Sequence, residues 1–540
     1  MRNKIKFYLG VIIVLIPSFL FVDNNILKPL NIKSALEISG ISFSDEDITT
    51  MTPYIQKNKN SYINMRGYKL DKSDRPAFNF TVNDQRSAIT NYEFKDIKTE
   101  LPEDKKDIAF LSIGELSYLI KNKKISSVDV TRIYIERIKS LDKHLKSFVT
   151  LTEELALEQA ERADEEIRKG NYRGILHGIP YGVKDLASFP GYPTTWGAMP
   201  LRNQFFNEKA YVIQRLESAG AVLLGKLSSG SLARGDVWFG GKTKNPWDLS
   251  QGSSGSSAGS AAAVSAALTP FAIGTETLGS IISPSTRCGV TGLRPTYGSI
   301  PTDGFMTLSW TMDKIGPIAK SPRDCAIVYN TIKKTNKGDV VTVNFDKKIK
   351  NLRIGYLKGL FDNDTSRFKD NNKKTLKLIR EEFDIEKINL PNKFPFSVFD
   401  IILRSEAGAF FDSFLLENLD SSMVEQGERS RANSLRQSRL IPAVEYIQAS
   451  RHRKLLIKET EKTFNEYDII LSPSFGKNQL LITNLTGHPA ISLPDGLDTE
   501  GRPTSISIIG NYGDEDKMLY FAEYLNKKIN FFKNKPPLFY

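Results

Sequence analysis

From residue 112 onward, apolar residues recur along the chain in helix-type stripes. Ser112 with Glu115 forms a capping box ahead of one stripe, and Ser126 with Asp129 opens the next. A third helix is predicted over residues 154–169. In the second of these stripes the apolar residues fall on a single helix face, as expected of a helix packed on a core.

Short apolar strands alternate with helices farther along the chain. We predict strands at residues 181–183, 221–224, 352–357 and 468–471. Alternation of this kind is typical of an α/β fold. We therefore expect one large domain with a mixed, twisted central sheet that helices cover on both faces.

The N-terminus carries a charged and then apolar pattern that is typical of export. Arg2, Lys4 and Lys6 precede an apolar run over residues 7–22. The run is shorter than the roughly 20 residues that span a bilayer, and no good cleavage site follows it. Residues 1–22 are therefore predicted to be an export signal or a membrane anchor, with a buried N-terminal helix as the alternative. We expect an exported protein, periplasmic or extracellular, with any membrane contact made through this segment.

Two further divisions of the chain follow from the pattern. Residues 23–106 are polar, rich in turns and without strong periodicity, which predicts an N-terminal extension that partly wraps the rest. Residues 107–540 are predicted to be the main domain. The stretch at about 334–351 is polar and is expected to be an excursion from it.

Composition narrows the classes of function. The 540 residues are 40% hydrophobic and 25% charged, which is ordinary for a globular protein, and the formal net charge is +12. Lys and Arg are scattered without a basic stripe between aromatics, so we expect no nucleic-acid partner. Cys288 and Cys325 are too few for a disulfide framework, and the four histidines lack the spacing of metal ligands. No metal and no cofactor are predicted, and the oligomeric state is not indicated.

Three segments carry candidate chemistry. In residues 177–185, Lys184 follows an apolar strand, and burial there would lower the pKa of its amine and leave it a base. In residues 251–268, a Ser/Gly turn leads into an alanine-rich helix. Residues 274–280 end in a turn at Ser280, beside backbone N–H donors, as a nucleophile over an oxyanion hole requires. Each segment alone has a plainer interpretation: a solvated lysine, a flexible linker or an ordinary turn serine.

Together, in this order and at this spacing, the segments resemble the amidase signature family. The resemblance extends to further motifs at residues 194–197, 245–250, 292–298, 313–317, 486–492 and 503–510. It covers nearly all of residues 107–530, and it implies that 107–540 is a catalytic domain of the amidase signature fold.

The resemblance implies a triad and a reaction. Lys184 matches the family's lysine and Ser280 its nucleophile, and Ser256 has the spacing of the middle serine, after a cis peptide bond from Gly255. Such an enzyme hydrolyses a carboxamide C–N bond of a small molecule through an acyl-enzyme intermediate. The implied oxyanion hole comprises the backbone N–H groups of Thr277, Leu278, Gly279 and Ser280.

The chain departs from the family's common pattern near the nucleophile. Glu276 stands where relatives often carry aspartate, Leu278 replaces a glycine, and Ile282 replaces an arginine that organises acidic neighbours. We therefore expect a different environment around the turn. Trp238 and Phe239 are candidate walls of the substrate pocket, although plain core aromatics would also account for them.

Two other functions remain open at this stage. The family also includes the A-type component of the amidotransferase that liberates ammonia from glutamine in a complex acting on charged tRNA. A catalytically silent binding scaffold is the second alternative, because some folds keep their shape and lose their chemistry.

Overall fold

The computed structural model describes residues 26–38, 40–70, 77, 89–334, 340–346 and 351–540. The predicted export segment, residues 1–22, lies outside the described residues. In the ranges that are described, no helix is both long and apolar enough to cross a membrane.

The centre of the fold is a sheet of eleven strands. In spatial order these are β14 (Ile385–Ile388), β13 (Ile354–Leu357), β15 (Ile469–Pro473), β17 (Pro503–Gly510), β16 (Ala490–Leu497), β10 (Thr291–Arg294), β11 (Lys314–Ala319), β9 (Phe271–Glu276), β3 (Pro180–Lys184), β4 (Val222–Leu227) and β2 (Phe148–Leu151). The sheet is mixed, because β3 runs parallel to β4 and β9, and β13 to β14 and β15, whereas the other neighbours are antiparallel. The four predicted strands correspond to β3, β4, β13 and β15.

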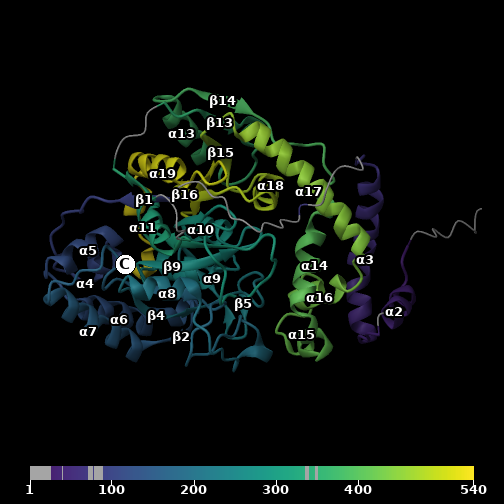
Figure 1. The fold of residues 1–540 in the computed structure, drawn as a ribbon, viewed down its shortest axis with the longest axis horizontal. Helices are drawn as coiled ribbons and strands as arrows, with labels where there is room; N and C mark the ends of the chain where they lie inside the picture. The colour runs from purple at the N-terminus through teal and green to yellow at the C-terminus, as the bar shows by residue number, and fades with distance from the viewer. Residues whose placement is uncertain (1–25, 39, 71–76, 78–88, 335–339, 347–350) are drawn as a thin grey trace, which may run out of the picture.

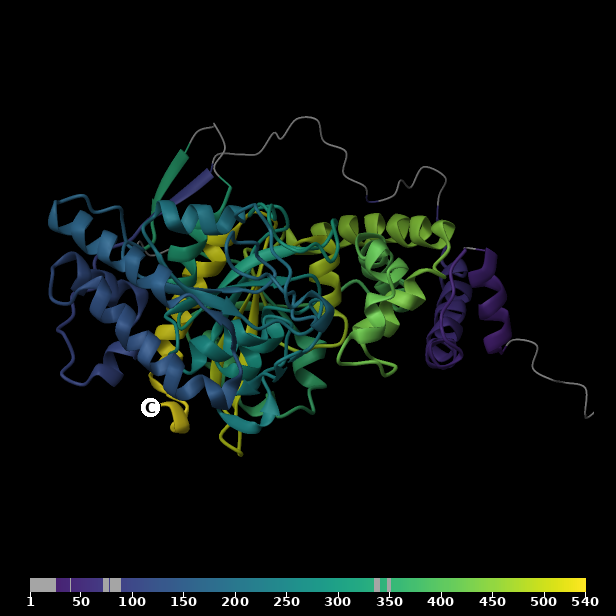
Figure 2. The ribbon, with the colours of Figure 1, turned by 90° about the horizontal axis from the view of Figure 1, so that it is seen from below.

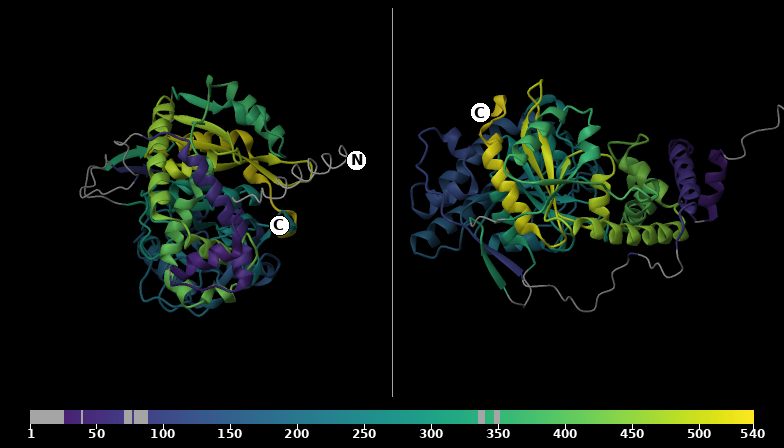
Figure 3. Two further views of the ribbon diagram at one scale, coloured as in Figure 1. Left: turned by 90° about the vertical axis from the view of Figure 1, so that its right-hand side faces the viewer. Right: turned by 90° about the horizontal axis from the view of Figure 1, so that it is seen from above.

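Helices flank this sheet on both faces, as predicted (Figures 1 and 3). They are α4 (Lys105–Phe110), α5 (Ile113–Lys121), α6 (Ser127–Leu145), α7 (Glu153–Arg168), α8 (Tyr211–Ser218), α9 (Ala258–Ser265), α10 (Ile282–Cys288), α11 (Pro322–Ile332), α12 (Lys358–Asp362), α13 (Lys369–Arg380), α18 (Gln479–Thr486) and α19 (Glu515–Ile529). The capping box of Ser112 and Glu115 is present at the start of α5.

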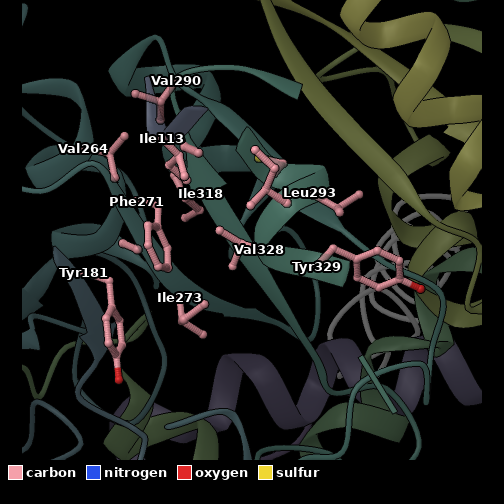
Figure 4. Close-up of a cluster of buried hydrophobic side chains, with 14 of the residues drawn as sticks. Ile113, Tyr181, Val264, Phe271, Ile273, Val290, Leu293, Ile318, Val328 and Tyr329 are labelled. Carbon is pink, nitrogen blue, oxygen red and sulfur yellow. The ribbon is translucent and has the colours of Figure 1, made fainter. Parts of the chain in front are cut away.

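The core lies between the sheet and these helices. Tyr181 of β3 stacks on Phe271 of β9 with ring centroids 5.5 Å apart, and the neighbouring aliphatic side chains fill the layer (Figure 4). Every residue of α9 is buried, as expected for the alanine-rich helix. A Cβ on Gly259 would lie 2.3 Å from the backbone oxygen of Ser147, so only glycine allows this close approach.

A layer of helices stands beside the sheet domain. It contains α14 (Asp400–Phe410), α15 (Asp412–Leu416), α16 (Arg431–Ser438) and α17 (Ala443–Phe464), with α2 (Pro29–Ile38) and α3 (Asp45–Arg66) at the outer end (Figure 2). The 22-residue α3 lies in the predicted extension, where no helix was expected. Its buried face includes Asn58, which accepts a hydrogen bond from buried Arg404, so apolar periodicity is weak there.

Small strands complete the structure. β1 (Ile89–Glu93) pairs in parallel with β12 (Val340–Asn344), so the predicted extension supplies a strand to a segment expected to be an excursion. The short strands β5 (Val237–Trp238), β6 (Gly241–Lys242), β7 (Lys244–Asn245) and β8 (Asp248–Gly252) form two hairpins before α9.

Candidate active site

Lys184 ends strand β3 with its side chain fully buried. Its Nζ donates to three hydroxyl oxygens, at 2.8 Å to Ser256 Oγ, 3.2 Å to Ser257 Oγ and 2.9 Å to Thr275 Oγ1. No carboxylate forms an ion pair with this amine among the described residues. Lys184 therefore lies in a cage of neutral hydroxyls, where its charged form has no direct counter-ion.

Burial is the dominant influence on this amine. Desolvation lowers the pKa of Lys184 well below its ordinary value, and the charges of Asp313 and Glu276 oppose that change only in part. The neutral amine, which can accept a proton, is thereby favoured at physiological pH.

Asp185 anchors the same strand end. Its Oδ1 lies 2.9 Å from the Nζ of buried Lys226, and its Oδ2 accepts the N–H of Thr195 at 3.0 Å. Lys226 also donates to Thr194 Oγ1 at 2.8 Å. This buried ion pair ties Lys184's strand to the loop at residues 194–197.

Ser256 lies at the turn that leads into α9, with 1% of its surface exposed. The peptide bond between Gly255 and Ser256 is cis, as expected from the resemblance. A Cβ on Gly255 would meet the backbone oxygen of Gly235 at 1.8 Å, so this position accepts only glycine. The packed turn directs the Ser256 hydroxyl to Lys184.

Ser280 lies in the turn between β9 and α10, partly buried. The backbone N–H of Ser257 donates to the backbone oxygen of Ser280 at 3.1 Å, which joins the two serine-bearing segments. In the described part of the chain no hydrogen bond joins the Ser256 and Ser280 hydroxyls. The structure thus contains the lysine–serine contact of the implied triad, and the Ser256–Ser280 contact is absent from it.

The turn before Ser280 provides free backbone donors. Gly279 adopts a φ of +89°, whereas Leu278 is not among the residues with positive φ, so the leucine that replaces a glycine is accommodated without strain. Within the described ranges, no acceptor receives a hydrogen bond from the backbone N–H of Thr277, Leu278, Gly279 or Ser280. These four groups are available to stabilise an oxyanion.

Glu276 holds the other side of this turn. Its Oε2 accepts the N–H groups of Ile281 at 2.8 Å and Ile282 at 2.9 Å. Its Oε1 accepts from Arg294 Nη1 at 2.9 Å and Asn484 Nδ2 at 2.8 Å. Arg294 therefore supplies, from β10, the cation that the family's common pattern places at position 282.

Electrostatics keep Glu276 ionised. Burial raises its pKa, but the charge of Arg294 and the hydrogen bond from Ile282 outweigh it and leave the pKa below the ordinary value. A fully buried ion pair with every carboxylate lone pair used fixes the position of the turn.

Asp313 holds the turn from the residue before β11. Its Oδ1 accepts the Thr277 hydroxyl at 2.6 Å, and its Oδ2 accepts the N–H groups of Leu308 at 2.7 Å and Ser309 at 3.0 Å. Burial raises the pKa of Asp313, and these hydrogen bonds oppose the rise. Asp313 thus connects the turn of Thr277 to the loop before β11.

A cavity of about 640 Å³ opens beside Thr275 and Thr277. Its apolar wall is formed by Leu186, Ile300, Phe305, Met306, Leu308 and Ile315, and Tyr297, Trp310 and Tyr512 are its aromatic members. Trp238 and Phe239 do not line this cavity. They pack against each other with centroids 4.9 Å apart, and their contact with substrate stays a prediction.

Sequence reasoning placed Lys184, Ser256 and the turn of Ser280 but missed the residues that hold them. Arg294, Asn484 and Asp313 all lie in segments that the resemblance covered. No pattern in the sequence indicated that these distant segments converge on the same turn, because their contacts depend on the order of strands in the sheet.

Comparison with curated proteins identifies long relatives. One is the A-type component of the glutamyl-tRNA(Gln) amidotransferase of Thermoanaerobacter pseudethanolicus, which is 32% identical over 479 residues, covering 79% of this chain and 98% of that protein. The protein of the same name from Acinetobacter baumannii is 31% identical over 474 residues, covering 76% and 95%.

These relatives correct the prediction of export. They are named for an amidotransferase of glutamyl-tRNA(Gln), and not for an exported protein. The predicted periplasmic or extracellular location is therefore wrong.

Solved structures and a family model agree with the fold. The peptide amidase of Stenotrophomonas maltophilia superposes with a TM-score of 0.67 at 25% identity, covering 79% of this chain and 98% of that one. An amidase family protein of Bacillus anthracis has the same fold, with a TM-score of 0.71 at 24% identity over 80% of this chain and 93% of that chain. The family model described as Amidase matches residues 129–483. The chain belongs to this family, the amidase signature enzymes.

Proposed function

We propose that this protein hydrolyses a carboxamide C–N bond, with Ser280 as nucleophile, Ser256 as proton relay and Lys184 as base. The observation that carries the proposal is the buried Lys184 amine, 2.8 Å from the Ser256 hydroxyl and without a counter-ion in the described chain. A neutral amine in that place is the base that a serine nucleophile needs.

The hydroxyl cage leaves the lone pair of the amine for Ser256. The Ser257 hydroxyl donates to the backbone oxygen of Thr275 at 3.0 Å, so its proton is already engaged. A neutral amine has two N–H donors, which Ser257 and Thr275 Oγ1 can accept, and one lone pair. That lone pair can receive the proton of Ser256.

The proposed reaction then runs in balanced steps. Ser280 attacks the amide carbon as its proton passes to Ser256, whose own proton passes to Lys184. The C–N bond breaks when the ammonium of Lys184 returns a proton through Ser256 to the leaving amine, which gives an acyl-enzyme on Ser280. Water attacks this ester by the same relay and releases the acid. The relay closes between Ser256 and Ser280 when substrate is bound, because catalytic hydrogen bonds commonly tighten at that stage.

The free N–H groups of the turn would hold the oxyanion of each tetrahedral intermediate. Loss of one such donor in a well-studied protease reduces the rate about 10²- to 10³-fold. The proposal requires no metal and no organic cofactor.

Ammonia release from a panel of primary amides tests the proposal. Ser280→Ala, Ser256→Ala and Lys184→Met should each lower turnover by at least about 10³-fold, the scale seen when a triad member is removed, while the protein stays folded by circular dichroism. Ser253→Ala is the matched control, because Ser253 belongs to the same turn but its hydroxyl donates to the backbone oxygen of Ser254. Wild-type turnover in Ser280→Ala would refute the proposal.

The second candidate function is that of the glutamine-hydrolysing component of an amidotransferase. It is favoured by the long curated relatives, which bear that name and are matched over nearly their whole length. Glutaminase activity measured with and without the partner proteins of such a complex separates the two functions. Turnover of simple amides by the isolated chain supports the amidase, and glutaminase activity only in a complex supports the amidotransferase.

A further inference from the structure

The cavity beside the triad is lined by a second buried lysine. Lys314 begins β11, pairs in register with Glu276 of β9 and has 2% of its surface exposed. Its amine donates to the backbone oxygen of Met312, and the proposed hydrolysis gives it no role. A buried ammonium that lines a cavity requires partners for all three of its donors.

The nearby carboxylates do not supply those partners. Glu276 accepts four hydrogen bonds, from two backbone N–H groups, Arg294 and Asn484. Asp313 accepts three, from Thr277 and two backbone N–H groups. In the part of the chain that the structure describes, Lys314 forms no ion pair. Two of its three donors therefore remain for a group in the cavity.

The electrostatic setting prepares this amine for an anion. Burial lowers the pKa of Lys314 to about 7, with Arg294 and Arg453 acting in the same direction and Glu276 and Asp313 opposing them. An anion in the cavity would favour the charged form and gain a charge-assisted hydrogen bond in a site with little water.

We propose that Lys314 binds a carboxylate on the acyl part of the substrate, so that the enzyme takes amides of dicarboxylic acids in preference to neutral amides. This inference rests on the proposed amidase function. The apolar wall between Lys314 and the aromatic rim suits the methylene chain of such an acid, and the cavity of about 640 Å³ has room for a short one. Thr275 and Thr277, which also line the cavity, place its inner end beside the triad.

The test compares matched pairs of substrates on the full chain. Succinamate, glutaramate and adipamate are each compared with the corresponding diamide, in which a neutral carboxamide of the same shape replaces the carboxylate. We expect wild-type kcat/KM, corrected for the two amides of the diamide, to be at least about tenfold higher for one or more of the acids. Equal or higher values for all three diamides would overturn the proposal.

Variants assign the preference to Lys314. Lys314→Met keeps most of the length of the side chain and should reduce the acid-to-diamide ratio about 10- to 100-fold, the range for a lost hydrogen bond to a charged group. Lys320→Met is the matched control, because burial also lowers the pKa of Lys320 to about 7, but this lysine donates to the backbone oxygen of Ala109 away from the cavity. That variant should keep the wild-type ratio.

Other outcomes distinguish this inference from the proposed function. Lys334 also lines the cavity, and loss of the preference in Lys334→Met but not in Lys314→Met would assign the carboxylate to the wrong lysine and overturn the inference. If Lys314→Met does not fold, the wild-type ratios decide. Hydrolysis of diamides without a preference for acids contradicts the inference and leaves the amidase intact, whereas no hydrolysis of any amide contradicts both.

Discussion

The Nζ of Lys184 lies 2.8 Å from the Oγ of Ser256, although 72 positions separate the two residues in the chain. β3 brings the lysine to this point, and the turn before α9 brings the serine. Both side chains are removed from solvent, so a proton exchanged between them does not equilibrate freely with bulk water.

The lowered pKa of Lys184 predicts the pH profile. Activity requires the unprotonated amine, and a lowered pKa means that this form persists as the pH falls below the ordinary range of lysine. The value of kcat/KM should therefore reach its plateau well below pH 10.5 and decline on the acid side as the amine is protonated. A profile that still rises up to pH 10.5 would show that the amine is not perturbed.

Asp313 should set the position of that acid limb. Its negative charge is the largest influence that favours the protonated form of Lys184. Asp313→Asn removes the charge while the amide can still bond to Thr277, so the limb of the kcat/KM profile should move to lower pH. A loss of turnover with the limb unmoved would mean that Asp313 acts on the turn alone.

The Glu276–Arg294 pair should be expensive to break from one side. Arg294→Met leaves a buried carboxylate without its cation, which costs about 3–5 kcal/mol in other proteins. Denaturant unfolding should show a large decrease in the midpoint. Lys139→Met removes one partner of an exposed pair with Glu153 and should cost about 1 kcal/mol or less. Equal shifts in the two variants would contradict this account of the buried pair.

Gly279 should be required for activity as well as for stability. An alanine there would adopt a φ of +89° and bring its Cβ to 2.9 Å from Leu480 Cδ2. The left-handed conformation costs about 1–2 kcal/mol for a residue with a Cβ. Gly513→Ala is the control, because Gly513 has a φ of +81° with open space around it. Both variants should lose stability, and only Gly279→Ala should lose kcat, since only its turn carries the oxyanion donors.

Local sequence patterns predicted the parts of the fold that depend on local physics. The capping box at Ser112, the alternating strands and the buried helix α9 follow from spacing and residue size. α3 could not be found this way, because Asn58 and Ser61 on its buried face interrupt the apolar stripe. The pairing of β1 with β12 joins segments 251 positions apart, and no pattern within either segment encodes it.

The candidate site divides in the same manner. Lys184, Ser256 and Ser280 lie in recognisable motifs, whereas Asp313, Arg294 and Asn484 gain their roles only from the neighbouring strands and helix that carry them. The cavity shows the same limit. Trp238 and Phe239 were chosen as large apolar side chains near a motif, but the order of strands places Phe305, Met306 and Trp310 at the cavity instead.

Covalent labelling of Ser280 tests the central claim most directly. The native protein is treated with a fluorophosphonate probe, and the modified residue is located by mass spectrometry. The account predicts one adduct, on Ser280, that is absent in Ser280→Ala and slowed by at least about 10³-fold in Lys184→Met, because the nucleophile then lacks its base. Labelling of a different serine, or equal labelling rates with and without the Lys184 amine, would contradict it.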